Sequence, residues 1–161
     1  MKPKSIRSRF SIGAIILSLA ATGFSGVFSF PAVAQNISVY RGPVQYPDFS
    51  GRDRAFAMYR TRIINEMRTG PNFAGRYAIV EIGCGSGCRF VFVAEVGTGK
   101  LYEFPYGGED FYMMSLTYGV KSNYITAQWI SEQTCVADDL TWNGARFISG
   151  GRRVIGDRSR C

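Results

Sequence analysis

The sequence has 161 residues, a length typical of one domain, and it is 46% hydrophobic and 19% charged. This balance is typical of a globular chain and excludes wholesale disorder. The sequence contains no histidine, which excludes the Ser-His-Asp triad, the Cys-His pair and every histidine-containing zinc site.

Residues 1–34 have the pattern of a secretory signal peptide. Basic residues without an acid precede an uncharged stretch of 20 residues (11–30), and Ala-Val-Ala at positions 32–34 supplies the small residues that a signal peptidase requires. A retained membrane anchor is the alternative, since this stretch is just long enough to span a bilayer. We expect cleavage before Gln35, which leaves a mature chain of residues 35–161 in the periplasm or secreted, with no membrane association.

The formal net charge of +7 falls to +3 on cleavage, because four of the 19 basic residues and none of the 12 acidic residues lie in the signal. Nucleic-acid binding requires many clustered cations, so we expect no nucleic-acid partner. The remaining basic residues are mostly arginines, gathered at positions 52–68 and 152–160. We interpret them as a solvated face and a solubilising tail, with a polyanion site as the alternative.

After an extended arm at residues 35–50, the pattern predicts a helix over residues 53–69. Apolar residues recur at steps of three and four and form one stripe that should face the core: Phe56, Tyr59, Ile63 and Met67. Arg60 and Arg62 lie off this stripe and should be exposed. Ser50 and Asp53 resemble a capping box at the start of the helix, and Gly70-Pro71 is a strong stop signal.

The remainder of the chain has the composition of β-strands. Residues 77–82 and 90–96 are apolar on both faces, which indicates central strands, and shorter strand-like runs follow as far as residue 148. Asn143-Gly144 predicts a hairpin with a type I′ turn. We therefore predict an α+β fold in a single domain, with one N-terminal helix packed on an antiparallel meander sheet of six to eight strands.

The hexapeptide Gly-Cys-Gly-Ser-Gly-Cys at positions 83–88 joins the two central strands. A structural disulfide is the favoured interpretation, because four cysteines in an exported chain are typical of two bridges. A redox dithiol is less favoured, since the spacing is C-x-x-x-C and no helix N-terminus follows. Zinc binding by the four cysteines does not fit their spacing. The fourth interpretation is an anion-binding nest formed by the N–H groups of Gly85, Ser86 and Gly87.

The pairing that we predict is Cys84–Cys88 and Cys135–Cys161. The hairpin brings the first pair together, and the second pair follows by elimination. The alternative is a long-range pairing, in which Cys84 or Cys88 is joined to one of the two later cysteines.

Residues 72–77, Asn-Phe-Ala-Gly-Arg-Tyr, precede this strand and hexapeptide. Together they resemble a family of small secreted bacterial proteins with an Asn-Phe-Ala-Gly-x-Tyr motif and a Gly-Cys-Gly-x-Gly-Cys motif. The resemblance covers residues 71–90 and extends loosely to residue 147. Members of the family often carry histidine at the position of Arg76 and tryptophan at that of Ile82, so this chain departs from the pattern there. The resemblance implies an envelope location and no particular activity.

Other chemistry-bearing residues are few. The adjacent acids at 109–110 and 138–139 are interpreted as ordinary turn acids. Neighbours on an extended chain point opposite ways, so neither pair alone can face one cleft, and a cross-pair such as Asp110 with Asp139 is the alternative. We assign no catalytic residue, metal ligand or cofactor. Asn72, Arg76 and Tyr106 are candidate ligand contacts; Tyr106 stands in a glycine-rich loop, where its ring is suited to stack on a sugar. Core packing is the favoured interpretation of the aromatic residues as a group.

Two functions from different classes fit these observations. The favoured hypothesis is an exported, disulfide-stabilised, non-catalytic binding module of the bacterial cell envelope, which binds a protein or a glycan and resembles inhibitors and immunity proteins only in size and location. The alternative is an envelope enzyme, either a thiol oxidoreductase at Cys84 and Cys88 or a carboxylate-based hydrolase.

Overall fold

The structure is a computed structural model that describes residues 36–161. The predicted signal peptide and the predicted N-terminus at Gln35 lie outside the described residues. Residues 36–161 belong to one compact unit. Among residues 36–161, none of the helices combines the length and the apolar character that crossing a bilayer requires.

A three-stranded antiparallel sheet comes first in the chain. It contains β1 (Tyr77–Gly85), β2 (Cys88–Glu95) and β3 (Leu101–Glu103) in that order. β1 and β2 pair without interruption from Tyr77 opposite Glu95 to Ile82 opposite Phe90. Successive side chains in a strand point to opposite faces, and both faces of this pair are apolar, as the sequence predicts for central strands.

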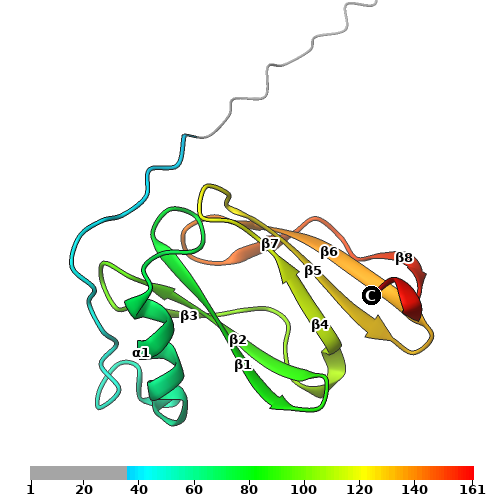
Figure 1. The fold of residues 1–161 in the computed structure, drawn as a ribbon, viewed down its shortest axis with the longest axis horizontal. Coiled ribbons are helices and arrows are strands. Elements are labelled where there is room, and N and C mark those ends of the chain that lie inside the picture. The colour runs from blue at the N-terminus through cyan, green and yellow to red at the C-terminus, as the bar shows by residue number, and fades with distance from the viewer. Residues whose placement is uncertain (1–35) are drawn as a thin grey trace, which may run out of the picture. The chain divides into compact units, whose positions relative to one another are not determined.

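The helix covers one face of this sheet (Figure 1). A 3₁₀ helix, η1 (Arg54–Tyr59), leads into α1 (Arg60–Arg68). Ile63 and Met67 are 0% exposed and pack with the residues of β1 and β2 that point to that face. Phe56 and Tyr59 are half-buried, and each ring lies 5.1 Å from that of Phe92. The predicted helix face is therefore confirmed, with Arg60 and Arg62 exposed.

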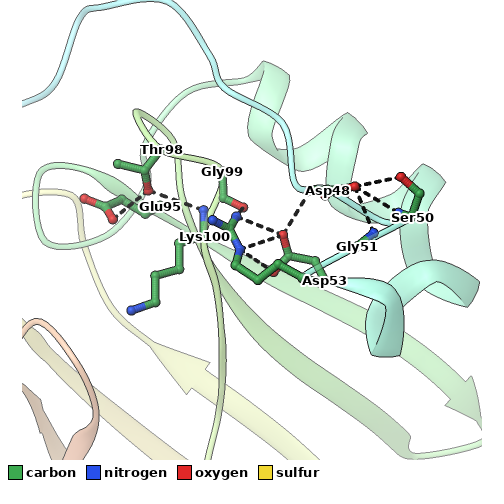
Figure 2. A network of polar contacts seen from close by, with 9 residues as sticks. Asp48, Ser50, Gly51, Asp53, Glu95, Thr98, Gly99 and Lys100 are labelled. Atoms are coloured by element: carbon green, nitrogen blue, oxygen red, sulfur yellow. Dashed lines mark hydrogen bonds and ion pairs between the residues drawn. The ribbon is translucent and has the colours of Figure 1, made fainter.

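The start of the helix differs from the prediction. Residues 36–53 precede it, so it is not N-terminal in the described chain, and the capping box is wrong. Asp48 takes both donors of the box, because its carboxylate accepts from the Ser50 N–H at 3.1 Å and its carbonyl accepts from the Asp53 N–H at 2.8 Å. The same carboxylate also accepts from Ser50 Oγ (2.8 Å) and the Gly51 N–H (3.0 Å), as Figure 2 shows. The Asp53 carboxylate accepts from the Asp48 N–H at 2.9 Å and pairs with Arg52. Both acids thus close a turn over residues 48–53 and leave the helix N-terminus uncapped.

The second sheet has five antiparallel strands: β4 (Tyr112–Thr117), β5 (Tyr124–Ser131), β6 (Thr134–Trp142), β7 (Phe147–Ser149) and β8 (Arg153–Asp157). Its order is β4-β5-β6-β7, and β8 pairs with β6 beyond the end of β7. Eight strands in the described residues lie within the predicted number, but they form two sheets, so the prediction of a single meander is wrong. No pairing joins β3 to β4 in the described chain, and the segment between them leads from one sheet to the other.

The two sheets enclose the larger core. The odd-numbered residues of β1 and β2, such as Ile79 and Val93, pack against Ile125, Trp129 and Leu140 of the second sheet. The first sheet is therefore the middle layer, with α1 on one face and the second sheet on the other (Figure 1). This arrangement explains why its two long strands have apolar side chains on both faces.

The hairpin between β6 and β7 is confirmed, but its type I′ turn is wrong. Trp142 pairs with Phe147, so four residues form the connection. The side-chain oxygen of Asn143 accepts hydrogen bonds from the N–H groups of Ala145 and Arg146, both at 2.9 Å. Asn143 does not take a positive φ, while Gly144 has φ 95°. The asparagine therefore builds a turn with its own side chain, a common alternative for this residue type.

Both predicted disulfides are confirmed. The Cα atoms are 5.1 Å apart in Cys84–Cys88 and 5.4 Å apart in Cys135–Cys161. Cys84 is the extra residue of a β-bulge, since Gly83 pairs with Arg89 and Gly85 with Cys88. The second bridge ties the C-terminal 3₁₀ helix, η3 (Arg158–Arg160), to β6.

The helix face predicts a sharp difference between two substitutions on α1. Ile63→Asp places a charge at a fully buried position and should cost on the order of several kcal/mol of unfolding free energy. Thr61→Asp, at an exposed position two residues away, should change it by less than about 0.5 kcal/mol. Denaturant unfolding measures both, and equal stability of the two variants would contradict the packing of α1.

The second bridge predicts the behaviour of Cys161→Ser. The disulfide encloses a loop with a sequence separation of 26, for which the chain-entropy model gives roughly 3–4 kcal/mol. The variant should melt at a lower temperature and carry one free thiol, at Cys135. Thiol counting and non-reducing peptide mapping check this result, and recovery of Cys84 joined to Cys135 in the parent protein would refute the pairing.

Candidate functional site

A cleft of about 530 Å³ opens beside the glycine–cysteine turn. We call it the turn cleft. It is lined by the end of β1, the start of β2, the first half of β4 and Cys161, with these residues in contact: Glu81, Ile82, Gly83, Gly85, Gly87, Cys88, Arg89, Met113, Met114, Ser115 and Cys161. The cleft therefore brings together the β1–β2 hairpin, β4 and Cys161, which are far apart in the sequence.

The position of the turn cleft follows from the sequence of β1. Along the face toward the second sheet, the side chains change from Tyr77 and Ile79 to Glu81 and Gly83. Across the pair, Arg89 replaces the buried Val91 on the same face of β2. The apolar core therefore ends at Ile79 and Val91, and the final turn of the hairpin leaves open space in front of β4.

An ion pair between Glu81 and Arg89 crosses the inner face of the hairpin at this point. The two side chains are 30% and 39% exposed, so the pair lies between core and solvent. The Tyr118 hydroxyl donates to Glu81 Oε1 at 3.4 Å. Burial, followed by the negative charge of Glu81, raises the pKa of Tyr118 to about 12. Tyr118 therefore stays a neutral hydrogen-bond donor to Glu81 at physiological pH.

The three glycines of the cleft wall differ in whether the fold requires a glycine at their position. Gly85 and Gly87 take φ values of 140° and 76°, which favour glycine. At Gly87 a Cβ would also lie 2.4 Å from the Tyr112 ring. Gly83 has no positive φ, and no atom lies within 4 Å of the place where its Cβ would be. Neither backbone conformation nor packing in the described residues requires a glycine at position 83.

Asn72 closes the outer edge of β1 at Ile79, and the edge is open beyond that residue. The Ile79 N–H donates to Asn72 Oδ1 at 2.7 Å, and Asn72 Nδ2 donates to the Ile79 carbonyl at 3.3 Å. This side chain thus replaces one rung of a neighbouring strand. Glu81 and Gly83 direct their backbone groups to the same edge, because alternate residues of an antiparallel strand do so, and they have no such partner among the described residues.

The sequence-predicted contact residues do not gather at one place. Asn72 is committed to the fold and also donates to Glu66 at 3.1 Å. Arg76 pairs with Glu95 at 3.1 Å, just before the start of β1 and so at the opposite end of that strand from the turn. Tyr106 is only 7% exposed and packs in the core, as the core interpretation of the aromatics predicts, so its ring is covered. Of the predicted nest, Gly85 and Gly87 line the cleft and Ser86 is exposed.

Sequence reasoning missed Glu81, Arg89 and the β4 residues that line the cleft. A signal for the first two exists in the chain, because each is a charged residue that borders the glycine–cysteine turn within an otherwise apolar strand. Nothing in the sequence places β4 opposite this turn. That contact includes a backbone hydrogen bond from the Met113 N–H to the Gly87 carbonyl, 2.7 Å long.

A second polar centre surrounds Asp138, which is 0% exposed. Its carboxylate accepts hydrogen bonds from Tyr106 Oη (2.5 Å), Ser149 Oγ (2.5 Å) and the Gly151 N–H (3.1 Å). Burial and this bond to Asp138 raise the pKa of Tyr106. With three donors on one carboxylate, Asp138 holds the segment between β7 and β8 against β6, which is a structural role.

Asp138 and Asp139 both lie within β6, so their interpretation as turn acids is wrong. Asp139 points away from Asp138, as the sequence predicts for neighbouring acids. It accepts from Thr126 Oγ1 at 2.7 Å and pairs with Arg153 at 2.7 Å. These two contacts, Thr126 first, lower the pKa of Asp139. A carboxylate-based hydrolase requires two acids that face one cleft, and Asp138 and Asp139 do not.

No family model matches the chain, and neither the curated proteins nor the solved structures contain a significant match to it. Within residues 36–161, no three or more Cys, Asp or Glu side chains are grouped so as to hold a metal ion. The turn cleft is the candidate site on its geometry alone.

The raised pKa of Tyr118 predicts an alkaline loss of stability. A folded-state pKa of about 12, above the ordinary value of 10.0, means that the neutral phenol contributes stability below pH 10.0 that is lost as the pH rises toward 12. Tyr118→Phe should therefore lose less unfolding free energy than the parent between these pH values. Denaturant titrations at several pH values measure the difference. Tyr124→Phe, at an exposed tyrosine outside the cleft, is the control, and identical profiles for Tyr118→Phe and the parent would contradict the burial of Tyr118.

Proposed function

We propose that the mature chain is an exported, disulfide-stabilised binding module of the bacterial cell envelope, and that it binds its partner at the turn cleft without catalysing a reaction. The observation that carries the proposal is the open space in front of Gly83, a glycine that the fold does not require. Glycine within a strand often marks a place where another chain or a ligand approaches closely.

The features around the cleft support binding more than chemistry. Its two charged side chains, Glu81 and Arg89, are paired with each other, so neither is a free acid, base or nucleophile. The turn itself is fixed by the Cys84–Cys88 disulfide, which holds the cleft wall in one shape before a partner arrives. Paired cysteines and the signal-like segment both support export.

A thiol oxidoreductase is the competing function, and one observation favours it: Cys84 is exposed and its disulfide is therefore accessible to other thiols. A redox site would exchange this disulfide rapidly with a dithiol substrate. A structural disulfide would resist exchange and leave no cysteine open to maleimide when the protein is purified without reductant. Catalytic reduction of a disulfide substrate by the parent protein, with loss of this activity in Cys84→Ser, would favour the enzyme.

The binding proposal is tested with two substitutions on β4. Ser115→Arg places a long side chain in the turn cleft, and Thr117→Arg places the same side chain on the same strand outside it. Tagged protein, cross-linked in envelope extract of the source bacterium, should capture a partner that Ser115→Arg loses and Thr117→Arg retains. Capture that is equal for both variants and the parent would contradict a site in the cleft. Proteomic and sugar analysis of the captured material identifies its class.

A further inference from the structure

The open edge of β1 carries unpaired backbone groups at the spacing to which a neighbouring β-strand forms hydrogen bonds. Glu81 and Gly83 continue the series of outward-facing backbone groups that begins at Tyr77, whose carbonyl accepts from the N–H groups of Asn72 and Phe73. Asn72 fills the next rung, at Ile79, with its side chain. Two rungs therefore remain, and they lie at the wall of the turn cleft.

We propose that the turn cleft binds an extended polypeptide segment of a partner protein, which adds to the edge of β1 by backbone hydrogen bonds at Glu81 and Gly83. This proposal rests on the binding function above and names its ligand class. Strand addition to an exposed sheet edge draws its affinity from main-chain hydrogen bonds and its specificity from pockets for alternate side chains. The turn cleft is one such pocket, beside the rung at Gly83.

The missing side chain at Gly83 gives this pocket its room. In an antiparallel or parallel pair, a residue opposite Gly83 directs its side chain to one face of the sheet, next to the place where the Cβ of residue 83 would be. That place has no atom within 4 Å. A side chain of the added strand therefore finds free volume there, between the hairpin and β4.

The walls of the pocket indicate what this side chain is. Met113 is 51% exposed and Met114 forms the floor at 1% exposed, so one wall consists of two thioether side chains. Methionine adapts to apolar groups of different shapes. The charges of Glu81 and Arg89 lie on the other side and are paired with each other. An apolar side chain fits this environment, flanked by polar residues that reach solvent.

A peptide suits the edge better than a glycan does. The two open rungs each present one N–H donor and one carbonyl acceptor at the repeat of a β-strand, and an extended peptide presents the complementary pair at the same repeat. A sugar chain has no such alternation. Among the described residues, those that line the cleft include no aromatic side chain, although the half-exposed Tyr112 ring lies next to Gly87.

The experiment uses the mature protein and a random peptide library displayed on phage. Selected peptides should bind the parent, and Gly83→Leu should weaken the binding at least about tenfold, because its side chain fills the pocket. Gly119→Leu is the matched control, since Gly119 likewise has no positive φ and no atom near its Cβ position, but lies outside the cleft. It should change the affinity less than about twofold. Both variants are checked for an intact Cys84–Cys88 bridge and an unchanged melting temperature.

Two further measurements separate strand addition from other binding. The amide protons of Glu81 and Gly83 should become protected from hydrogen exchange when the peptide binds. N-methylation of alternate peptide residues should abolish binding when the methylated N–H groups are those that face β1. Methylation of the intervening residues, whose N–H groups face away from β1, should leave binding intact. Failure to select any peptide, binding that is insensitive to Gly83→Leu, or equal effects of the two N-methylation patterns would overturn the proposal.

Its failure is distinguishable from that of the binding function. If Ser115→Arg abolishes capture from the envelope and the captured material is a glycan, the cleft binds but strand addition is wrong. If both β4 variants capture like the parent, neither proposal stands. Protection of Glu81 and Gly83 that rises with protein concentration in the absence of peptide would identify a second copy of this chain as the occupant and overturn a separate partner.

Discussion

The pairing of β1 with β2 is the constraint on which the rest of the structure depends. Both strands are apolar on both faces over most of their length, so neither face is stable in contact with water. The helix stripe of Ile63 and Met67 buries one face and the aromatic core of the second sheet buries the other. A single meander would have left one of these faces uncovered, which explains why the chain divides its strands between two sheets.

The same hairpin also decides where the core stops. Beyond Ile82 the two strands carry glycines, cysteines and Arg89 in place of apolar side chains, so hydrophobic burial no longer holds them together. The Cys84–Cys88 bridge holds the turn in their place. Because this bridge is local, the shape of the cleft wall is maintained without side chains that would fill the cleft.

The sequence predicted those elements whose causes are local. The stripe on η1 and α1, the two central strands and the Cys84–Cys88 disulfide follow from spacing along the chain, and the structure confirms them. The Cys135–Cys161 disulfide followed by elimination once the first pair was assigned, and it is confirmed as well. The capping box failed because Asp48, five residues before Asp53, accepts the backbone N–H groups of both Ser50 and Asp53. β8 was missed because Arg153 and Gly156 interrupt its apolar pattern, and its pairing with β6 depends on residues distant in the sequence. The cleft itself was missed for the same reason, since Met113 and Ser115 reach it from another sheet.

The open edge at Glu81 and Gly83 is a hazard unless it is selective, because an unpaired strand edge is a template for aggregation. Two features limit that hazard. Asn72 closes the edge at Ile79, so only a short part of the nine-residue strand remains open. The Glu81–Arg89 pair then places charges beside the open rungs, which disfavours a flat, apolar neighbour. Under the proposed strand addition, an edge that is short, charged and backed by one apolar pocket would accept a segment with a matching side chain and resist indiscriminate pairing. Asn72 and the Glu81–Arg89 pair would then set how selectively this edge binds.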